Sequence, residues 1–440
     1  MNITKHILLW GLMAALARPA MAQSNGSNSS YSRFGLGTLN GQSQGFNRSM
    51  GGVAQGLADG QIVNVQNPAS YSRIDSTTFI LDAGMGLQFG RFSQNGNNIN
   101  ARNTSFDYAT AGFRLCRGLG MGIGFMPYST IGYNFANTAR VDNSLATGQD
   151  ITTTTTYYGN GGLHQMFLGL GWNPFAHLSI GVNAAYVWGN YSHTLTQTYA
   201  EGGTTSSDYI SQNMAWDSDI RTYKLDFGVQ YPIILNPQNM LTLGASVGLG
   251  HRIGSEVTMM RYTSAKDTVQ DARSNALEIP LTFGVGAAWQ HKGRLTLAAD
   301  YQQQRWEGCR VPVASTIDGI PQIDVRTDQY LIRHQVKVGA EYRQDPTGTD
   351  KHYANKIKYR IGAQYTTPYT RVNGADGPTE YGVTAGVALP ITQSGRSVVN
   401  VGMEWMRRKP SVGTQITENY LMLHLGVSFS ENWFMKRKFR

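Results

Sequence analysis

The chain has 440 residues, of which only 15% are charged and 51 are glycine, and its formal net charge is +9. No apolar run after residue 22 reaches the roughly 20 residues that a transmembrane helix needs, so the sequence excludes a helical membrane protein. Few charges, many glycines and a mean hydropathy of −0.31 favour a membrane β-barrel, in which lipid-facing and lumen-facing residues alternate. A multidomain soluble β protein is the alternative.

The N-terminus has the pattern of a secretory signal peptide. Lys5 precedes an apolar run from Ile7 to Ala17, and Ala20-Met21-Ala22 then forms a small-residue cleavage site. The apolar run is too short for a membrane anchor, which is the alternative interpretation. We therefore predict that residues 1–22 are removed on export.

The positive charge is dispersed and ends in a basic tail, residues 431–440. Without Lys5 and Arg18 of the leader, the formal charge is 9 − 2 = +7. Basic tails bind nucleic acid in some proteins, but in an exported chain contact with anionic lipid or lipopolysaccharide, or plain solvation, is the better expectation. We expect this tail to lie in the periplasm and expect no nucleic-acid partner.

Residues 23–76 form a segment without strand periodicity. It is rich in Gly, Ala and Asn, and it contains the run Asn67-Pro68-Ala69-Ser70 just before the first strand. From the sequence of residues 51–58 we expect a short helix or a compact loop. A barrel of intermediate size needs something in its lumen, and this segment is the natural candidate for a plug.

From residue 77 to 430 the chain alternates between apolar and polar residues, which is the period of a β-strand. In the first strand, Leu81 and Leu87 share one face, whereas Asp82 and Gln88 share the other. The pattern predicts an all-β fold, a 14-stranded antiparallel transmembrane barrel. The predicted strands are 77–90, 105–116, 119–134, 163–172, 177–192, 219–231, 239–252, 276–290, 294–306, 330–343, 355–367, 379–391, 397–408 and 418–430.

The connections between these strands alternate in length. Those after even-numbered strands are mostly short, whereas those after odd-numbered strands are mostly long and polar, as in residues 135–162 and 193–218. Short turns at one end and long loops at the other are typical of outer-membrane barrels, with the long loops facing outward. The Thr-rich residues 151–158 are compatible with a strand extension above the membrane.

The third predicted strand contains an irregularity. Pro127 follows lumen-facing glycines, the last of which is Gly124, and lies between Met126 and Tyr128. Proline removes a ladder donor and occurs at edges or bulges, and a bulge would bend the strand. We expect a kink that opens a gap in the wall; the alternative is that Pro127 only ends the membrane part of the strand.

Motifs for catalysis or metal binding are weak. Residues 244–248 match G-x-S-x-G, but within a strand rather than at the strand-to-helix turn that a nucleophile elbow needs. The nine His residues show no metal-ligand spacing, and we expect no metal, no cofactor and no enzyme activity; a barrel lipase is the weakest hypothesis. Cys116 and Cys309 fall at opposite ends of the predicted barrel, so we expect them to be unpaired. Carboxylates on the polar faces of the strands are expected to be solvated wall residues: Asp82, Asp226, Asp300, Glu341 and Glu404.

The Asn67-Pro68-Ala69 run, the strand count with a preceding segment and the irregular third strand resemble the FadL/TodX family of outer-membrane transporters for hydrophobic compounds. The runs at 31–35 and 432–438 are similar to FadL-like proteins of the Bacteroidetes. The resemblance implies a lumenal hatch that includes Asn67, Pro68, Ala69 and Ser70. It also implies a lateral opening near Gly124, Met126, Pro127 and Tyr128.

The resemblance implies two functions. One is passive uptake of hydrophobic compounds, such as long-chain fatty acids, across the bacterial outer membrane. The other is a non-transporting accessory role in a secretion or barrel-assembly complex, with other envelope proteins as partners. A transporter predicts an apolar cavity beneath the outer loops, and a polar lumen would count against it.

Overall fold

The computed structural model describes residues 28–94, 96–141, 151–175, 177–201, 204–205, 209–317, 320–348, 350–392, 396–413 and 415–432. The predicted leader, the start of the predicted plug segment and residues 433–440 of the predicted tail lie outside the described residues.

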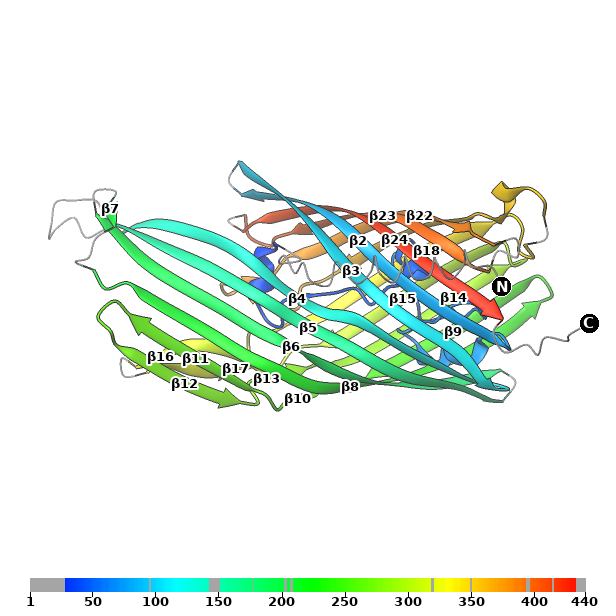
Figure 1. The fold of residues 1–440 in the computed structure, drawn as a ribbon, viewed down its shortest axis with the longest axis horizontal. Helices are drawn as coiled ribbons and strands as arrows, with labels where there is room; N and C mark the ends of the chain where they lie inside the picture. Colours follow the sequence, from blue (N-terminus) through cyan, green and yellow to red (C-terminus); the bar gives the residue numbers. More distant parts are fainter. Residues whose placement is uncertain are drawn as a thin grey trace, which may run out of the picture.

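Fourteen long strands form a closed antiparallel barrel (Figure 1), as the alternation predicts. Each pairs with its neighbours along the chain, and the last pairs with the first to close the barrel. The strands are β2 (Thr78–Gln94), β3 (Asn97–Cys116), β4 (Leu119–Val141), β5 (Ile151–Phe175), β6 (Leu178–Glu201), β8 (Gln212–Asn236), β9 (Asn239–Gly248), β14 (Leu281–His291), β15 (Leu295–Arg305), β18 (Ile332–Arg343), β19 (Lys358–Thr366), β22 (Thr379–Pro390), β23 (Val398–Lys409) and β24 (Thr417–Asn432).

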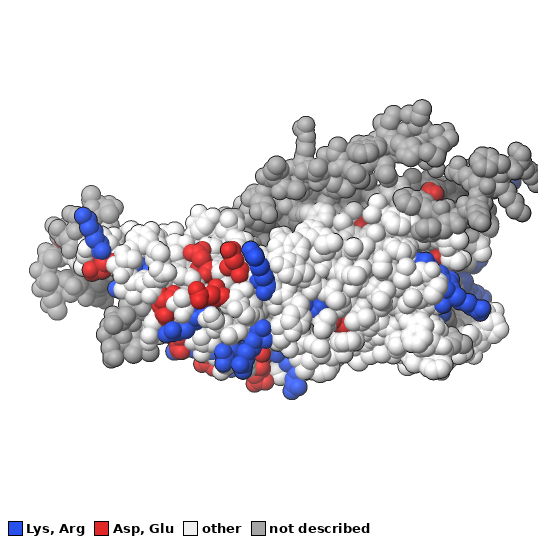
Figure 2. Space-filling view, turned by 60° about the horizontal axis from the view of Figure 1, so that its bottom comes forward, with Lys and Arg blue, Asp and Glu red and all other residues white. Residues whose placement is uncertain are grey.

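The barrel wall is apolar on its outer face and polar on its inner face, which is the reverse of a soluble barrel. On β5, Leu168 and Leu170 are exposed, whereas polar side chains such as Asn183 and Gln230 on the next strands are buried. A closed barrel with an apolar exterior satisfies its backbone without water, so it can cross a bilayer. Figure 2 shows a zone with few charged side chains between the more charged ends of the molecule. Among the described residues, no helix is long and apolar enough to cross a membrane.

Two of the predicted long loops are largely strand. The predicted loop 135–162 is shortened because β4 and β5 continue to Val141 and from Ile151, pairing as far as that last pair of residues. Similarly, β6 and β8 extend into the predicted loop 193–218. Thr-rich and polar residues hide these extensions in the sequence, because both faces of a strand beyond the membrane are polar. The strand extension expected for residues 151–158 is present.

At the same end of the barrel, β2 and β3 pair as far as Gln94 and Asn97, and three other connections carry small paired strands. They are β10 (His251–Ile253) with β13 (Leu277–Ile279), β11 (Glu256–Thr263) with β12 (Thr268–Ser274), β16 (Val311–Ile317) with β17 (Ile320–Arg326), and β20 (Arg371–Val372) with β21 (Ala375–Asp376). A two-residue strand, β7 (Thr204–Thr205), adds to β6. Both cysteines are free, with Cys116 exposed and Cys309 buried, so the prediction that they are unpaired is confirmed.

Residues 28–77, here called the N-terminal segment, pack against inward-facing residues of the wall, and their elements lie within the barrel outline in Figure 1. The segment contains η2 (Ser30–Arg33), β1 (Thr38–Leu39), α2 (Gly45–Arg48) and η3 (Pro68–Arg73). Between these short elements the chain is irregular. Its contacts with the wall carry the candidate site.

Candidate functional site

Glycines on the inward face of the wall let the N-terminal segment approach the strands closely. A Cβ atom at Gly244 of β9 would lie 1.8 Å from the carbonyl oxygen of Gln55, and one at Gly362 of β19 would lie 2.1 Å from the backbone nitrogen of Gly51. Only a residue without a side chain allows such contact. Several of the glycines that the alternation assigns to the lumen are therefore contact points, here called seats, for the segment's backbone.

The segment is also tied to the wall by buried polar groups. Asp300 of β15 accepts hydrogen bonds from the backbone N–H groups of Ala54 and Gln55, the second at 2.9 Å. Gln230 donates to the carbonyl oxygen of Gln55 at 2.8 Å. Asp300 is thus not a solvated wall residue, as its place on the polar face suggested. It satisfies backbone donors that would otherwise be buried without a partner.

The four residues of the predicted hatch are all buried, at the start of η3. The Asn67 side chain accepts from the backbone N–H of Ala69, and it donates to the carbonyl oxygens of Gln55 at 2.9 Å and Val229 at 3.2 Å. It therefore caps the helix and binds the wall at once. Pro68 occupies the first helical position, where its missing N–H costs nothing. It packs on the backbone of Gly181, while Ser70 lies within the segment.

The predicted irregularity in the third strand, β4, lies where the pairing of β3 with β4 stops. In the described residues these strands pair only up to Ala109 and Phe125. Beyond that point β5 is the only long barrel strand among the described residues that pairs with β4, and a register shift between Pro127 and Ser129 leaves Tyr128 unmatched. Gly124 is the last glycine of β4 that pairs with β3, and Met126 points inward and is buried. We call the unpaired stretch between β3 and β4 the seam.

The N-terminal segment replaces β3 along this edge. Gln42 donates to the carbonyl oxygen of Pro127 at 3.2 Å, and the backbone N–H of Asn40 donates to that of Tyr128 at 3.0 Å. Next, β1 pairs with residues 129–130 of β4. Because the N–H and C=O of one strand residue point to the same side, the donor that Pro127 lacks would face the seam. Proline is tolerated there because no barrel strand needs that hydrogen bond.

A second bulge, which we did not predict, lies on the other side of the seam. The register of β2 against β3 shifts between Gly84 and Met85, so that Asp107 has no partner residue. This shift turns Phe106 outward, where its ring lies 5.5 Å from that of Phe125 across the seam. It also turns Asp107 inward, where it pairs with Arg48 of the N-terminal segment.

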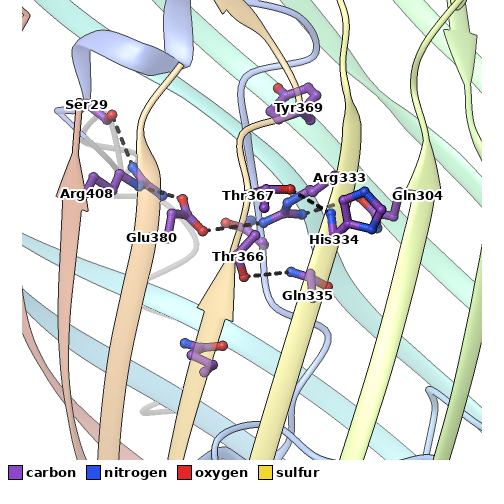
Figure 3. Close-up of polar contacts among 12 residues, drawn as sticks. Ser29, Gln304, Arg333, His334, Gln335, Thr366, Thr367, Tyr369, Glu380 and Arg408 are labelled. Carbon is purple, nitrogen blue, oxygen red and sulfur yellow. Dashed lines mark hydrogen bonds and ion pairs between the residues drawn. The ribbon is translucent and has the colours of Figure 1, made fainter. Parts of the chain in front are cut away.

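A cavity of about 490 Å³ lies behind the seam. Its inner lining carries paired charges. His424 lies between two carboxylates, with Nδ1 3.4 Å from Asp107 and Nε2 3.3 Å from Glu404. Figure 3 shows the neighbouring chain of contacts, in which Glu380 accepts from Arg408 at 2.7 Å and from Arg333 at 3.4 Å.

The end of the lumen nearer the long connections is filled by a packed apolar cluster, which we call the outer core. Trp306, Tyr330 and Met259 are among its fully buried members, and it joins the small hairpins to the ends of β4, β6 and β8. Tyr369 packs on Trp306 and donates to the carbonyl oxygen of Gly37, so the cluster also meets the N-terminal segment. The apolar side chains beneath the loops thus form a packed core and not an open apolar cavity.

The structure offers little for catalysis. Among the described residues no group of three His, Cys, Asp or Glu side chains could hold a metal ion. The G-x-S-x-G match lies within β9 and continues as regular strand pairing, without the turn that a nucleophile elbow requires.

Comparison with known families gives one match over almost the whole chain. The BamG family model matches residues 3–440. The chain belongs to the BamG family. No curated protein matches this BamG-family sequence.

Solved structures with the same fold include toluene transporters and a FadL homologue. The toluene transporter TodX of Pseudomonas putida is 15% identical, with a TM-score of 0.56 over 91% of this chain and 100% of its own. The toluene transporter TbuX of Ralstonia pickettii is 15% identical, with a TM-score of 0.56 over 89% and 98%. A FadL homologue from Pseudomonas aeruginosa is 11% identical, with a TM-score of 0.58 over 91% and 99%. At such identities the likeness shows the fold, and it agrees with the resemblance drawn from the sequence.

Proposed function

We propose that this protein is an accessory subunit of a barrel-assembly complex in the bacterial outer membrane, and that its barrel is closed. The observation that carries the proposal is the filled lumen. The N-terminal segment occupies the inner face of the wall, and the outer core fills the end nearer the long connections. The cavity between them has apolar lining residues, but paired charges interrupt that lining. A diffusion path for apolar solutes needs continuous apolar lining, because moving such solutes past buried charges forfeits the gain of leaving water.

The BamG match supports the same function, since the family's name is formed on that of the barrel-assembly machinery. In this account residues 23–76 are a permanent plug, residues 1–22 a cleaved signal peptide, and residues 431–440 a periplasmic tail. The exterior contacts the bilayer and lipopolysaccharide. The short runs near both ends support a place in the Bacteroidetes branch of FadL-like proteins.

Affinity purification tests the proposal. The full-length protein carries a tag in the β16–β17 hairpin, and membranes are solubilised in a mild maltoside detergent. We expect stoichiometric recovery of at least one other barrel protein of the assembly machinery, whereas an unrelated tagged outer-membrane barrel of similar abundance recovers none. Recovery of the protein alone from native-level expression would overturn the proposal.

A second candidate, a passive channel for hydrophobic compounds, is favoured by the seam. The strand pairing ends at the predicted kink, and the similar structures include toluene transporters. Solute would pass the hatch at residues 67–70 and leave beside Pro127. The test is uptake of labelled toluene and long-chain fatty acid by cells with the wild type, with Pro127→Ala or without the protein. Equal uptake in all three strains would remove this candidate.

A further inference from the structure

The cavity behind the seam reaches the lipid-facing surface of the barrel. Its lining includes Leu87 and Phe106, whose side chains point outward and are 47% and 38% exposed. The same cavity touches Glu404 and Arg333 on the opposite wall. A molecule in the bilayer can therefore meet the cavity sideways, through the seam, although the outer core fills the end of the lumen nearer the long connections.

The outer mouth of the seam is an aromatic surface. The ring of Phe125 lies 5.5 Å from that of Phe106 and 5.8 Å from that of Trp188, which stacks on Tyr186 at 5.5 Å. Tyr186 is 52% exposed. Exposed aromatic rings of this kind contact acyl chains near a membrane interface, so an apolar tail would lie along them.

The inner part of the cavity is polar and balanced in charge. Its lining holds three arginines, Arg48, Arg333 and Arg408, and three carboxylates, Asp107, Glu380 and Glu404. A purely anionic or purely cationic group would meet one repulsive partner for each attractive one. A group with both charges can satisfy both kinds of side chain with charge-assisted hydrogen bonds.

Two residues that line the cavity carry buried polar atoms without a hydrogen-bond partner among the described residues. These residues are Ser129, through its buried Oγ atom, and His164, through its buried Nδ1 atom. Buried polar groups are normally satisfied. The volume of about 490 Å³ lies within the range of small-molecule sites.

We propose that the seam binds one amphipathic lipid with a zwitterionic headgroup, of the phosphate-and-amine kind. The headgroup occupies the cavity between the arginines and the carboxylates, and the acyl chains lie outside on Phe106, Phe125 and Tyr186. This site is independent of the accessory role, because it requires only the isolated barrel. It also differs from a solute channel, because the ligand enters and leaves from the bilayer.

The experiment is native mass spectrometry of the purified full-length protein in a maltoside detergent with added lipid. We expect one bound phosphatidylethanolamine, with an affinity at least tenfold higher than that for phosphatidylglycerol with the same acyl chains. Glycerophosphoethanolamine, which has the headgroup but no acyl chains, should bind at least tenfold more weakly than the lipid. That arm separates a lipid site from a site for a free phosphate compound.

A cavity-filling variant gives the matched control. Gly41 lines the cavity, and a Cβ atom there meets no heavy atom within 4 Å, so Gly41→Phe fills the space without disturbing the wall. Gly254 is equally open but outside the cavity, and Gly254→Phe is the control. We expect Gly41→Phe to lower lipid affinity at least tenfold and Gly254→Phe to leave it unchanged. Equal binding of both lipids, or wild-type binding by a folded Gly41→Phe protein, would overturn the proposal.

Discussion

Single residues on the inner face decide how the N-terminal segment is held. Glycine at positions such as 244 and 362 removes the side chain that would otherwise block the segment's backbone. The alternation of the strands assigns these glycines to the lumen correctly. It does not indicate what they contact, because a glycine in the sequence looks the same whether its position faces water or a packed backbone.

A side chain added at one of these glycines should displace the N-terminal segment locally. In Gly244→Leu the new side chain collides with the Gln55 carbonyl group, and overpacking of this kind costs about 1–3 kcal/mol. Hydrogen-exchange mass spectrometry should show faster exchange in residues 53–57 with barrel strands unchanged. Ser246→Ala, two residues along the same face, is the control and should exchange like the wild type. Unchanged exchange in Gly244→Leu would contradict the seating role.

At the short-turn end, Asp345 organises the connection between β18 and β19. Its carboxylate accepts from the Asp350 backbone N–H at 2.7 Å and from the Thr347 hydroxyl at 2.8 Å, and these hydrogen bonds lower the pKa of Asp345 to about 2. Because the folded pKa is depressed, the carboxylate's contribution to the turn is complete above its ordinary pKa of about 3.9 and is lost as the pH falls through about 2.

Carbon NMR of labelled aspartate side chains measures this shift. The Asp345 carboxyl carbon should titrate with a midpoint near 2, assigned by its loss in Asp345→Asn. In Thr347→Val the hydroxyl donor is removed and the backbone donors remain, so the midpoint should rise part of the way toward the ordinary value. A wild-type midpoint near 3.9 would show that the turn does not hold the carboxylate.

At the scale of elements, two bulges and one proline make the seam. Pro127 and its neighbours could be singled out from the sequence because proline in a strand has a known cost. The bulge at Asp107 could not, because residues 105–116 keep an acceptable alternation in either register. The cluster of Asp107, His424 and Glu404 was missed for the same reason, since it exists only after that shift.

The N-terminal segment is also fixed at its first described element. Glu418 of β24 is fully buried and accepts from Ser29 Oγ at 2.8 Å, from Arg408 at 3.2 Å and from the Tyr420 hydroxyl at 2.7 Å. Figure 3 shows Arg408 of this group donating both to Ser29 and to Glu380. The anchor lies on β24, whereas β1 of the same segment pairs with β4, so the segment spans the inner side of β2 and β3.

Neutralising Glu418, which anchors Ser29, should loosen the start of the N-terminal segment. Glu418→Gln keeps the shape but weakens the charged hydrogen bonds, at a cost of about 1–3 kcal/mol, while Arg408 keeps its contact with Glu380. Limited trypsin digestion should then cut after Arg33 at least several-fold faster than in the wild type. Glu431→Gln, an exposed change on the same strand, should digest normally. Equal cleavage of Glu418→Gln and the wild type would argue against the anchor.

At the scale of the whole molecule, the strand count, the closure and the division into a short-turn and a long-connection end follow from periodicity and spacing. The outer core does not, because its members come from seven or more separate stretches of chain and are brought together only by the hairpins. The expected loops 135–162 and 193–218 concealed strand extensions for a related reason. The alternation of apolar and polar residues reveals a strand only when one of its faces is apolar, and these extensions have polar residues on both faces.

Because the N-terminal segment and the outer core fill the lumen, the barrel favours a role in an assembly complex over diffusion of solutes through it. The most direct test is quantitative proteomics of the outer membrane after depletion of this protein, with re-expression of the wild type as the control. The account predicts that the folded amounts of other β-barrel proteins fall several-fold and recover on re-expression. Unchanged barrel levels after complete depletion would contradict it.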